Sequence, residues 1–169
     1  MAQVSVLFFP DPEGKTLDVV DAKTRSHMMS KIKSTGTRPE MIVRKYLHGC
    51  GFRYALHKKN LPGSPDLVLS KYKLTIFVHG CFWHRHNGCF YTSNPATRTD
   101  FWVNKFEGNV IRDRKNVLEL ERLGWRVLIV WECGLKHSLE RISEMRSIIL
   151  DGSDYAEWPH KPVRTLKVN

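Results

Sequence analysis

The sequence lacks any apolar run long enough to cross a bilayer. A transmembrane helix needs about 18 or more consecutive apolar residues, and none of the 169 residues begins such a run. The start of the chain, MAQVSVLFFP, has an apolar patch but no basic segment before it and no small-residue cleavage site. We therefore expect an N-terminal extension rather than a signal peptide, no membrane partner, and a cytoplasmic protein.

Acidic residues are also scarce. The chain has 17 Asp and Glu residues against 27 Lys and Arg residues, which gives a formal net charge of +10. A field of this strength favours polyanionic partners, with nucleic acid ahead of an anionic membrane surface. The length of 169 residues and the 41% hydrophobic content fit one domain with a proper core. The sequence shows no internal repeat and no low-complexity tract.

Cysteine is scarce too, and the four cysteines are arranged like metal ligands rather than like a disulfide framework. The stretch 76–90, IFVHGCFWHRHNGCF, holds Cys81, His86 and Cys89 in the pattern C-x4-H-x2-C. Tetrahedral zinc needs a fourth ligand, and Cys133 after the apolar run WRVLIVWE is the best candidate. A closed set of four ligands predicts a structural zinc site. The alternative is a group of buried cysteines with a surface histidine.

Three apolar side chains have two open interpretations each. Phe82 and Trp83 lie between the first two zinc-ligand candidates, beside His84 and Arg85. A loop fixed by metal would hold these rings rigidly for stacking on bases or wedging between them, or the rings could simply cover the metal site. Met29 lies on a basic helical segment. It packs on the core in the simpler interpretation and wedges into the DNA minor groove in the other.

Hydrophobic periodicity predicts a single domain over 18–150, between an N-terminal extension over 1–17 and a loose polar tail over 151–169. The predicted helices cover 18–35, 37–47, 97–123 and 139–150, and the predicted strands cover 52–56, 66–69, 74–79 and 125–131. This order indicates an α/β sandwich with a mixed central sheet.

Helix caps can be assigned from short polar motifs. Thr37 and Glu40 fit a capping box, which gives Glu40 a structural explanation beside any functional one. Thr97 or Thr99 is expected to cap the long third helix, and Ser138 the last helix.

An aspartate at the start of a strand suggests phosphodiester chemistry. Asp66 follows Pro65 and opens an apolar strand that leads into another strand. Carboxylates at strand ends can hold Mg²⁺, which activates water and neutralises charge in the transition state. Metal-dependent nucleases often place Glu/Asp-x-Lys on the next strand, but the sequence here reads Phe77-Val78-His79. A backbone carbonyl near Val78 and waters would have to complete the site.

The missing lysine requires another general base. A histidine has an ordinary pKa near neutrality, which makes His84 and His79 candidates. Asp113 could orient the imidazole of the base. The alternative for Asp113 is a solvated ion pair, because it lies between Arg112 and Arg114.

The motifs AKTRSHMMSKIKSTGTRPE, LPGSPDLVLS, IFVHGCFWHRHNGC, PATRTDFW and NVIRDRKNVLELERLGWRVLIVWEC together resemble the very short patch repair (Vsr) endonuclease family over residues 21–140. The resemblance implies a three-layer, restriction-endonuclease-like fold with a structural zinc site. It also implies nicking of double-stranded DNA on the 5′ side of the thymine in T·G mismatches, which arise when 5-methylcytosine is deaminated. The protein would be a monomer near the nucleoid, with mismatch-repair proteins as further candidate partners.

The resemblance also implies roles for individual residues. Asp66 and the Val78 carbonyl would bind catalytic Mg²⁺, and His84 would be the general base beside Asp113. Glu40 and His79 would be secondary catalytic residues that act through waters or on the scissile phosphate. The zinc ligands would be Cys81, His86, Cys89 and Cys133. The residues that wedge into the duplex would be Phe82, Trp83 and Trp102 from the major groove and Met29 from the minor groove.

Two other classes of protein share part of this pattern. A restriction-type nuclease would use the same fold, Asp66 and Mg²⁺ to cut fully paired sites. A non-catalytic, zinc-stabilised DNA-binding module would explain the charge and the cysteines, but not Asp66, His84 and Asp113 together.

Overall fold

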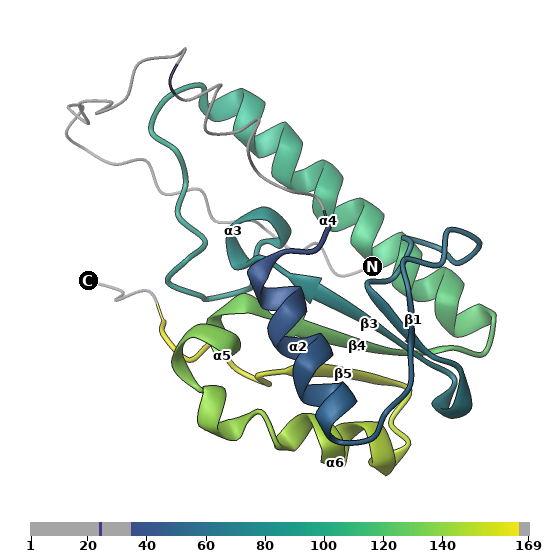
Figure 1. Ribbon diagram of the computed structural model, residues 1–169. Coiled ribbons are helices and arrows are strands. Elements are labelled where there is room, and N and C mark those ends of the chain that lie inside the picture. The colour runs from purple at the N-terminus through teal and green to yellow at the C-terminus, as the bar shows by residue number, and fades with distance from the viewer. Residues whose placement is uncertain (1–23, 25–34, 166–169) are drawn as a thin grey trace. The chain divides into compact units, whose positions relative to one another are not determined.

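A five-stranded mixed sheet lies at the centre of the computed structural model (Figure 1), which describes Thr24 and residues 35–165. The strand order is β1-β2-β3-β4-β5. Strands β1–β2 and β2–β3 pair antiparallel, and β3–β4 and β4–β5 pair parallel. The strands are β1 (Ala55–Leu56), β2 (Leu67–Leu69), β3 (Leu74–His79), β4 (Arg126–Trp131) and β5 (Tyr155–Trp158). The predicted mixed α/β architecture is confirmed.

Helices cover both faces of the sheet and make three layers (Figure 1). One buried cluster joins the sheet to α2 (Arg38–Gly49), α5 (Glu132–His137) and α6 (Glu144–Asp151). A second cluster on the other face joins it to α4 (Thr99–Arg122) and to the three buried cysteines. Successive residues of β4 alternate between the two clusters, so its continuous apolar sequence is buried on both faces, as expected.

The capping box at the start of α2 is present. The Thr37 hydroxyl accepts from the Glu40 N–H, and the Glu40 carboxylate accepts from the Thr37 N–H. Val43 and Leu47 bury the inner face of this helix completely. The cap therefore fixes where the helix begins, and the Glu40 carboxylate lies 3.9 Å from His57, which follows the edge strand β1.

Two predicted caps are wrong. The N-cap of α4 is Arg98, in the left-handed conformation and without a side-chain cap bond, and Thr99 already lies inside the helix. Ser138 does not begin a helix over 139–150, because its N–H closes the last turn of α5 on the Gly134 carbonyl at 2.8 Å. The segment that follows contains a short 3-10 helix, Leu139–Arg141, before α6.

The tail is not loose over its first part. Residues 155–158 form β5, which pairs in parallel with β4, and Trp158 is 1% exposed. A domain boundary at residue 150 therefore omits one strand of the sheet. The strand predicted over 52–56 is shorter than expected, with only Ala55 and Leu56 in β1.

The predicted helix over 18–35, including Met29, lies outside the described residues apart from Thr24, which is helical, and Thr35, which lies in a bend and not in a helix. The same holds for the N-terminal extension. Across the part of the chain that the structure describes, no helix is both long and apolar enough to span a membrane.

Candidate active site and metal centre

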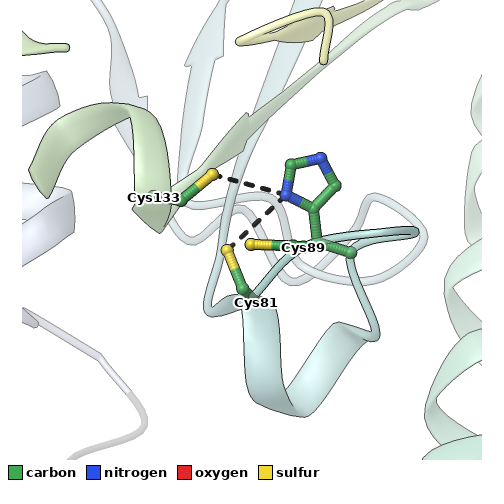
Figure 2. Close-up of side chains that lie close together, drawn as sticks. Cys81, Cys89 and Cys133 are labelled. Atoms are coloured by element: carbon green, nitrogen blue, oxygen red, sulfur yellow. Dashed lines mark hydrogen bonds between the residues drawn. The ribbon is translucent and has the colours of Figure 1, made fainter. Parts of the chain in front are cut away.

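Four buried side chains converge beside the sheet as a candidate metal centre (Figure 2). Cys81 opens the short helix α3 (Cys81–His84), His86 and Cys89 follow it, and Cys133 comes directly after β4 in α5. One potential ligand atom from each lies within 4.8 Å of the others. His86 Nδ1 is 3.6 Å from Cys81 Sγ and 3.4 Å from Cys133 Sγ. All four predicted ligands are therefore brought together.

The chemistry of this cluster fits a metal ion. Three thiols and one imidazole are the N and S donors that tetrahedral zinc takes in structural sites, and four protein donors leave no open position. Hydrogen bonding with Cys81 and His86 lowers the pKa of the Cys133 thiol to about 4, despite its burial. The shared proton and burial raise the pKa of Cys81. A bound divalent cation would displace the thiol protons, because cysteine binds metal as the thiolate.

Strand register places Asp66 at the edge of the candidate active site. Leu56 pairs with Leu67 in the antiparallel β1–β2 ladder, so His57, one residue after β1, faces Asp66, one residue before β2. On its other side, Asp66 Oδ2 accepts the backbone N–H of Val78 in β3 at 2.8 Å. Asp66 therefore sits at the mouth of the β2–β3 hairpin, as predicted, and a main-chain donor fixes one of its two oxygens.

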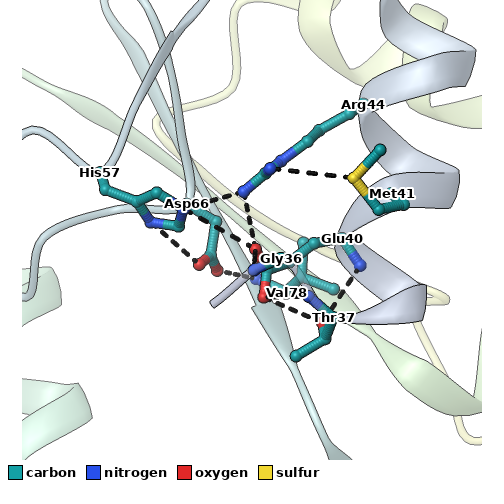
Figure 3. A network of polar contacts seen from close by, with 8 residues as sticks. All are labelled: Gly36, Thr37, Glu40, Met41, Arg44, His57, Asp66 and Val78. Carbon is teal, nitrogen blue, oxygen red and sulfur yellow. Dashed lines mark hydrogen bonds and ion pairs between the residues drawn. The ribbon is translucent and has the colours of Figure 1, made fainter. Parts of the chain in front are cut away.

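Asp66 belongs to a polar network with Glu40, Arg44 and His57 (Figure 3). Burial raises the pKa of Asp66, and the hydrogen bond from the Val78 N–H opposes this shift. The Glu40 carboxylate raises the pKa further, and the Arg44 guanidinium lowers it. The free oxygen, Oδ1, has no hydrogen-bond partner among the described residues, and a carboxylate oxygen is a donor that Mg²⁺ prefers. Asp66 thus fits a cation site.

The three predicted proton-transfer residues also come together. His84 Nδ1 lies 2.6 Å from Asp113 Oδ2, so α3 and α4 each contribute one member of an imidazole–carboxylate pair. The His79 ring stacks on the His84 ring, with centroids 3.8 Å apart and an interplanar angle of 10°. Because His79 follows Val78 in β3, the Asp66 network and the histidine pair meet at the end of the same strand.

The two stacked histidines, His79 and His84, have different electrostatic surroundings. Burial, reinforced by the charge of His84, lowers the pKa of His79 to about 3. Such an imidazole is neutral near pH 7 and a poor proton acceptor. Burial alone would raise the pKa of Asp113, but the hydrogen bond and charge of His84 outweigh it, and the pKa is lowered. Asp113 is therefore an ionised partner of His84 rather than a solvated ion pair with its arginine neighbours.

The predicted wedge residues form one aromatic cluster between α3 and α4. The Phe82 ring makes edge contacts with Trp83 at 5.0 Å and Trp102 at 5.7 Å, and it also meets the buried Phe106 at 5.0 Å. The first three side chains are partly exposed. The cluster therefore joins the core through Phe106 and still presents aromatic surface.

Three residues of the site were missed by sequence reasoning. Arg44 contacts His57 and the Glu40 carboxylate, and His57 Nδ1 lies 3.8 Å from the Asp66 carboxylate. The i,i+4 spacing of Glu40 and Arg44 was a usable signal, but His57 required the strand register. Asn109 donates to the Trp83 carbonyl at 3.0 Å and so ties α3 to α4. Its spacing of four residues from Asp113 placed both on one helix face.

Comparison with known proteins shows which family the chain resembles. Residues 17–90 match the family model "DNA mismatch endonuclease Vsr". The chain is 47% identical over 119 residues to the DNA mismatch endonuclease Vsr of Escherichia coli, covering 70% of this chain and 76% of that protein. It is 45% identical to the type II nicking enzyme V.NmeAIP of Neisseria meningitidis, covering 79% and 97%, and 42% identical to the type II nicking enzyme V.XorIIP of Xanthomonas oryzae, covering 78% and 96%.

These relatives, together with a candidate cation site beside a histidine–carboxylate pair on a mixed sheet, define the chain as a DNA endonuclease. It belongs to the Vsr family of DNA mismatch endonucleases.

Proposed function

We propose that the protein nicks double-stranded DNA on the 5′ side of the thymine in T·G mismatches that arise from deamination of 5-methylcytosine, by Mg²⁺-dependent hydrolysis. The observation that carries this proposal is the 2.6 Å His84–Asp113 pair at the strand end that also holds Asp66. A general base and an oxygen-donor cation site at one place are what phosphodiester hydrolysis requires. Relatives named as mismatch and nicking enzymes support the substrate and the single-strand cut.

Asp66 and the Val78 carbonyl would hold Mg²⁺ at the mouth of the hairpin. When bound there, the ion supplies charge neutralisation for the phosphorane-like transition state and lowers the pKa of a bound water. The Val78 N–H holds Asp66 Oδ2 in place. The Glu40 carboxylate caps α2 and pairs with Arg44. Glu40 would therefore help to position Arg44 beside the cation site.

His84 would accept the proton of the attacking water. Its Nδ1 contacts Asp113, so Nδ1 carries the hydrogen and Nε2 is left with the lone pair that accepts a proton. Ionised Asp113 then stabilises the imidazolium that forms. Neutral His79, stacked on His84, fixes the ring orientation without competing for the proton.

The aromatic cluster of Phe82, Trp83 and Trp102 would enter the duplex from the major groove, with Met29 entering from the minor groove. Unstacking costs a few kcal/mol per step and least at a mismatch, so wedging itself favours T·G over paired DNA. The cluster has one buried anchor, Phe106, which supports a rigid platform for this insertion. The net charge of +10 supplies attraction to the phosphate backbone.

The Cys81, His86, Cys89 and Cys133 cluster would hold structural Zn²⁺. This centre would tie α3, which carries His84, to the end of β4, and so preserve the catalytic geometry. We further propose a monomeric protein that acts in the cytoplasm on nucleoid DNA, with mismatch-repair proteins as additional partners.

Cleavage of an end-labelled duplex with one T·G pair tests this chemistry. We expect one nick 5′ of the thymine with Mg²⁺, none with EDTA, and none from the Asp66→Asn variant. Double-strand cuts at a paired site would assign the protein to the restriction class. Intact binding without any cleavage over a panel of flanking sequences would indicate a non-catalytic DNA-binding module.

A further inference from the structure

His57 occupies an unusual place beside the candidate cation site. It follows β1 directly and faces Asp66 across the β1–β2 register, with His57 Nδ1 3.8 Å from Asp66 Oδ1 (Figure 3). Its backbone is in the left-handed region, with φ of +45°. Residues other than glycine seldom adopt this conformation, and such positions cluster at functional sites. The chain therefore holds this imidazole toward Asp66 in a backbone conformation that glycine or asparagine would adopt more easily.

Arg44 determines which ring nitrogen of His57 carries the hydrogen. One terminal nitrogen of the Arg44 guanidinium lies 2.8 Å from His57 Nε2 and 2.7 Å from Glu40 Oε2. A guanidinium only donates hydrogen bonds, so His57 Nε2 must be the acceptor and its hydrogen must reside on Nδ1. The Nδ1–H group is the one that faces Asp66 Oδ1.

The Arg44 side chain is mostly buried although some of its guanidinium donors are unsatisfied among the described residues. Its side chain is only 12% exposed, yet Nε is buried without a hydrogen-bond partner among the described residues. Within the part of the chain that the structure describes, another of its nitrogens reaches only the Met41 thioether, at 3.9 Å. Buried polar atoms are normally satisfied, and exceptions call for an explanation. The position that Arg44 adopts satisfies Glu40 and His57 at the expense of its remaining donors.

We propose that His57 is a positioning residue for the cation site, held by Arg44 as the Nδ1–H tautomer so that it orients the Asp66 carboxylate. Each of the two Asp66 carboxylate oxygens is then oriented by a different hydrogen-bond donor. The Val78 N–H fixes Oδ2 at 2.8 Å, and a shift of about 1 Å would bring His57 Nδ1–H into hydrogen-bond range of Oδ1. Partners of ligating carboxylates restrict ligand rotation, and their loss typically weakens metal affinity or activity by about 10- to 100-fold.

This inference rests on the proposed function, because it assigns the cation to Asp66. The first test is independent of activity. The carbon and nitrogen NMR shifts of the His57 ring, assigned by the signal lost in His57→Gln, distinguish the two neutral tautomers. We expect the Nδ1–H tautomer in the wild type and a shift toward the Nε2–H tautomer in Arg44→Met. An Nε2–H tautomer in the wild type would overturn the inference.

The second test measures the cation site. His57→Gly removes the ring and relieves the left-handed backbone, whereas His57→Gln retains an N–H donor. Lys73→Gly is the matched control, because Lys73 also has a positive φ, of +49°, but lies at the opposite end of β3. Thermal unfolding checks that each variant is folded.

Bound Mn²⁺ is followed by electron paramagnetic resonance, and nicking of the T·G duplex is followed as Mg²⁺ is varied. We expect His57→Gly to raise the half-saturating concentration of both ions about tenfold or more. His57→Gln should raise this concentration less, and Lys73→Gly should leave it at the wild-type value. If the wild-type protein nicks the T·G duplex but His57→Gly leaves both half-saturating concentrations unchanged, the role of His57 is refuted and the proposed function is not. Wild-type protein that never nicks the T·G duplex would refute the proposed function, while the tautomer and Mn²⁺ measurements would still decide the placement of His57.

Discussion

The His84–Asp113 pair allows a quantitative prediction for the Asp113→Asn variant. The pair is short, at 2.6 Å, and both side chains are largely shielded, with 27% and 21% exposure. The amide keeps the shape but loses the charge that would stabilise protonated His84, and its NH₂ group can turn the imidazole to the Nε2–H tautomer. General-base catalysis is worth roughly 10²- to 10⁴-fold in rate. We therefore expect the nicking rate to fall within that range, or roughly 3–5 kcal/mol in activation free energy.

The assay is single-turnover nicking of a T·G duplex with saturating enzyme and Mg²⁺. Glu119→Gln is the matched control, because it makes the same carboxylate-to-amide change on α4 at an exposed pair with Lys115. Exposed pairs contribute about 0–1 kcal/mol to stability, so this control should nick at the wild-type rate. A rate for Asp113→Asn within a few-fold of the control would refute His84 as a base oriented by Asp113.

The Asp113 carboxylate also links stability to pH. His84 lowers its folded-state pKa below the ordinary value of 3.8, so the pair stabilises the fold above that pH, and the stabilisation is lost as pH falls through the lowered pKa. The difference in the free energy of urea unfolding between wild type and Asp113→Asn should therefore be largest near neutral pH and decrease only below about pH 4. A difference that already disappears between pH 7 and 5 would contradict this sign.

Three further predictions concern the supports of the site. Cys133→Ser should lower bound zinc well below one ion per chain by elemental analysis and lower the melting temperature, whereas Cys50→Ser, outside the cluster, should change neither. Glu157→Leu should reduce the free energy of urea unfolding by about 1–3 kcal/mol, because the aliphatic side chain cannot accept the Trp131 indole N–H that Glu157 accepts at 2.6 Å, and an unchanged value would argue against that contact. Trp83→Ala should weaken binding of the T·G duplex by about 1–3 kcal/mol, measured by fluorescence anisotropy. A lower free energy of unfolding with unchanged DNA binding would instead favour a purely structural role for the Trp83 ring.

The elements closest to the site could be predicted because their signals are local. The capping box at Thr37 and the apolar runs of β3 and β4 depend on neighbouring residues only, and the structure confirms them. The four metal-ligand candidates also came from local spacing plus one residue at a strand end. Asp66 and His79 followed from their positions at the ends of two adjoining strands.

The remaining features depend on contacts between distant segments. Strand β5 is short, and its burial comes from pairing with β4 and from Trp158 packing in the core, which no local pattern in YAEW revealed. His57 reaches Asp66 only because β1 pairs with β2 in a particular register. The helix predicted over 139–150 is divided because the Ser138 N–H closes α5 and its carbonyl begins a separate 3-10 helix, Leu139–Arg141. Tertiary pairing, not propensity, decided each of these positions.

Mismatch discrimination tests the central claim most directly. Two duplexes identical except for T·G or C·G at one position, in a cytosine-methyltransferase target sequence, are end-labelled and incubated with the protein and Mg²⁺ under single-turnover conditions. We expect one nick 5′ of the thymine in the T·G duplex and a rate lower by about tenfold or more on the C·G duplex, since unstacking is least costly at a mismatch. Equal cleavage of the two duplexes would contradict a mismatch endonuclease.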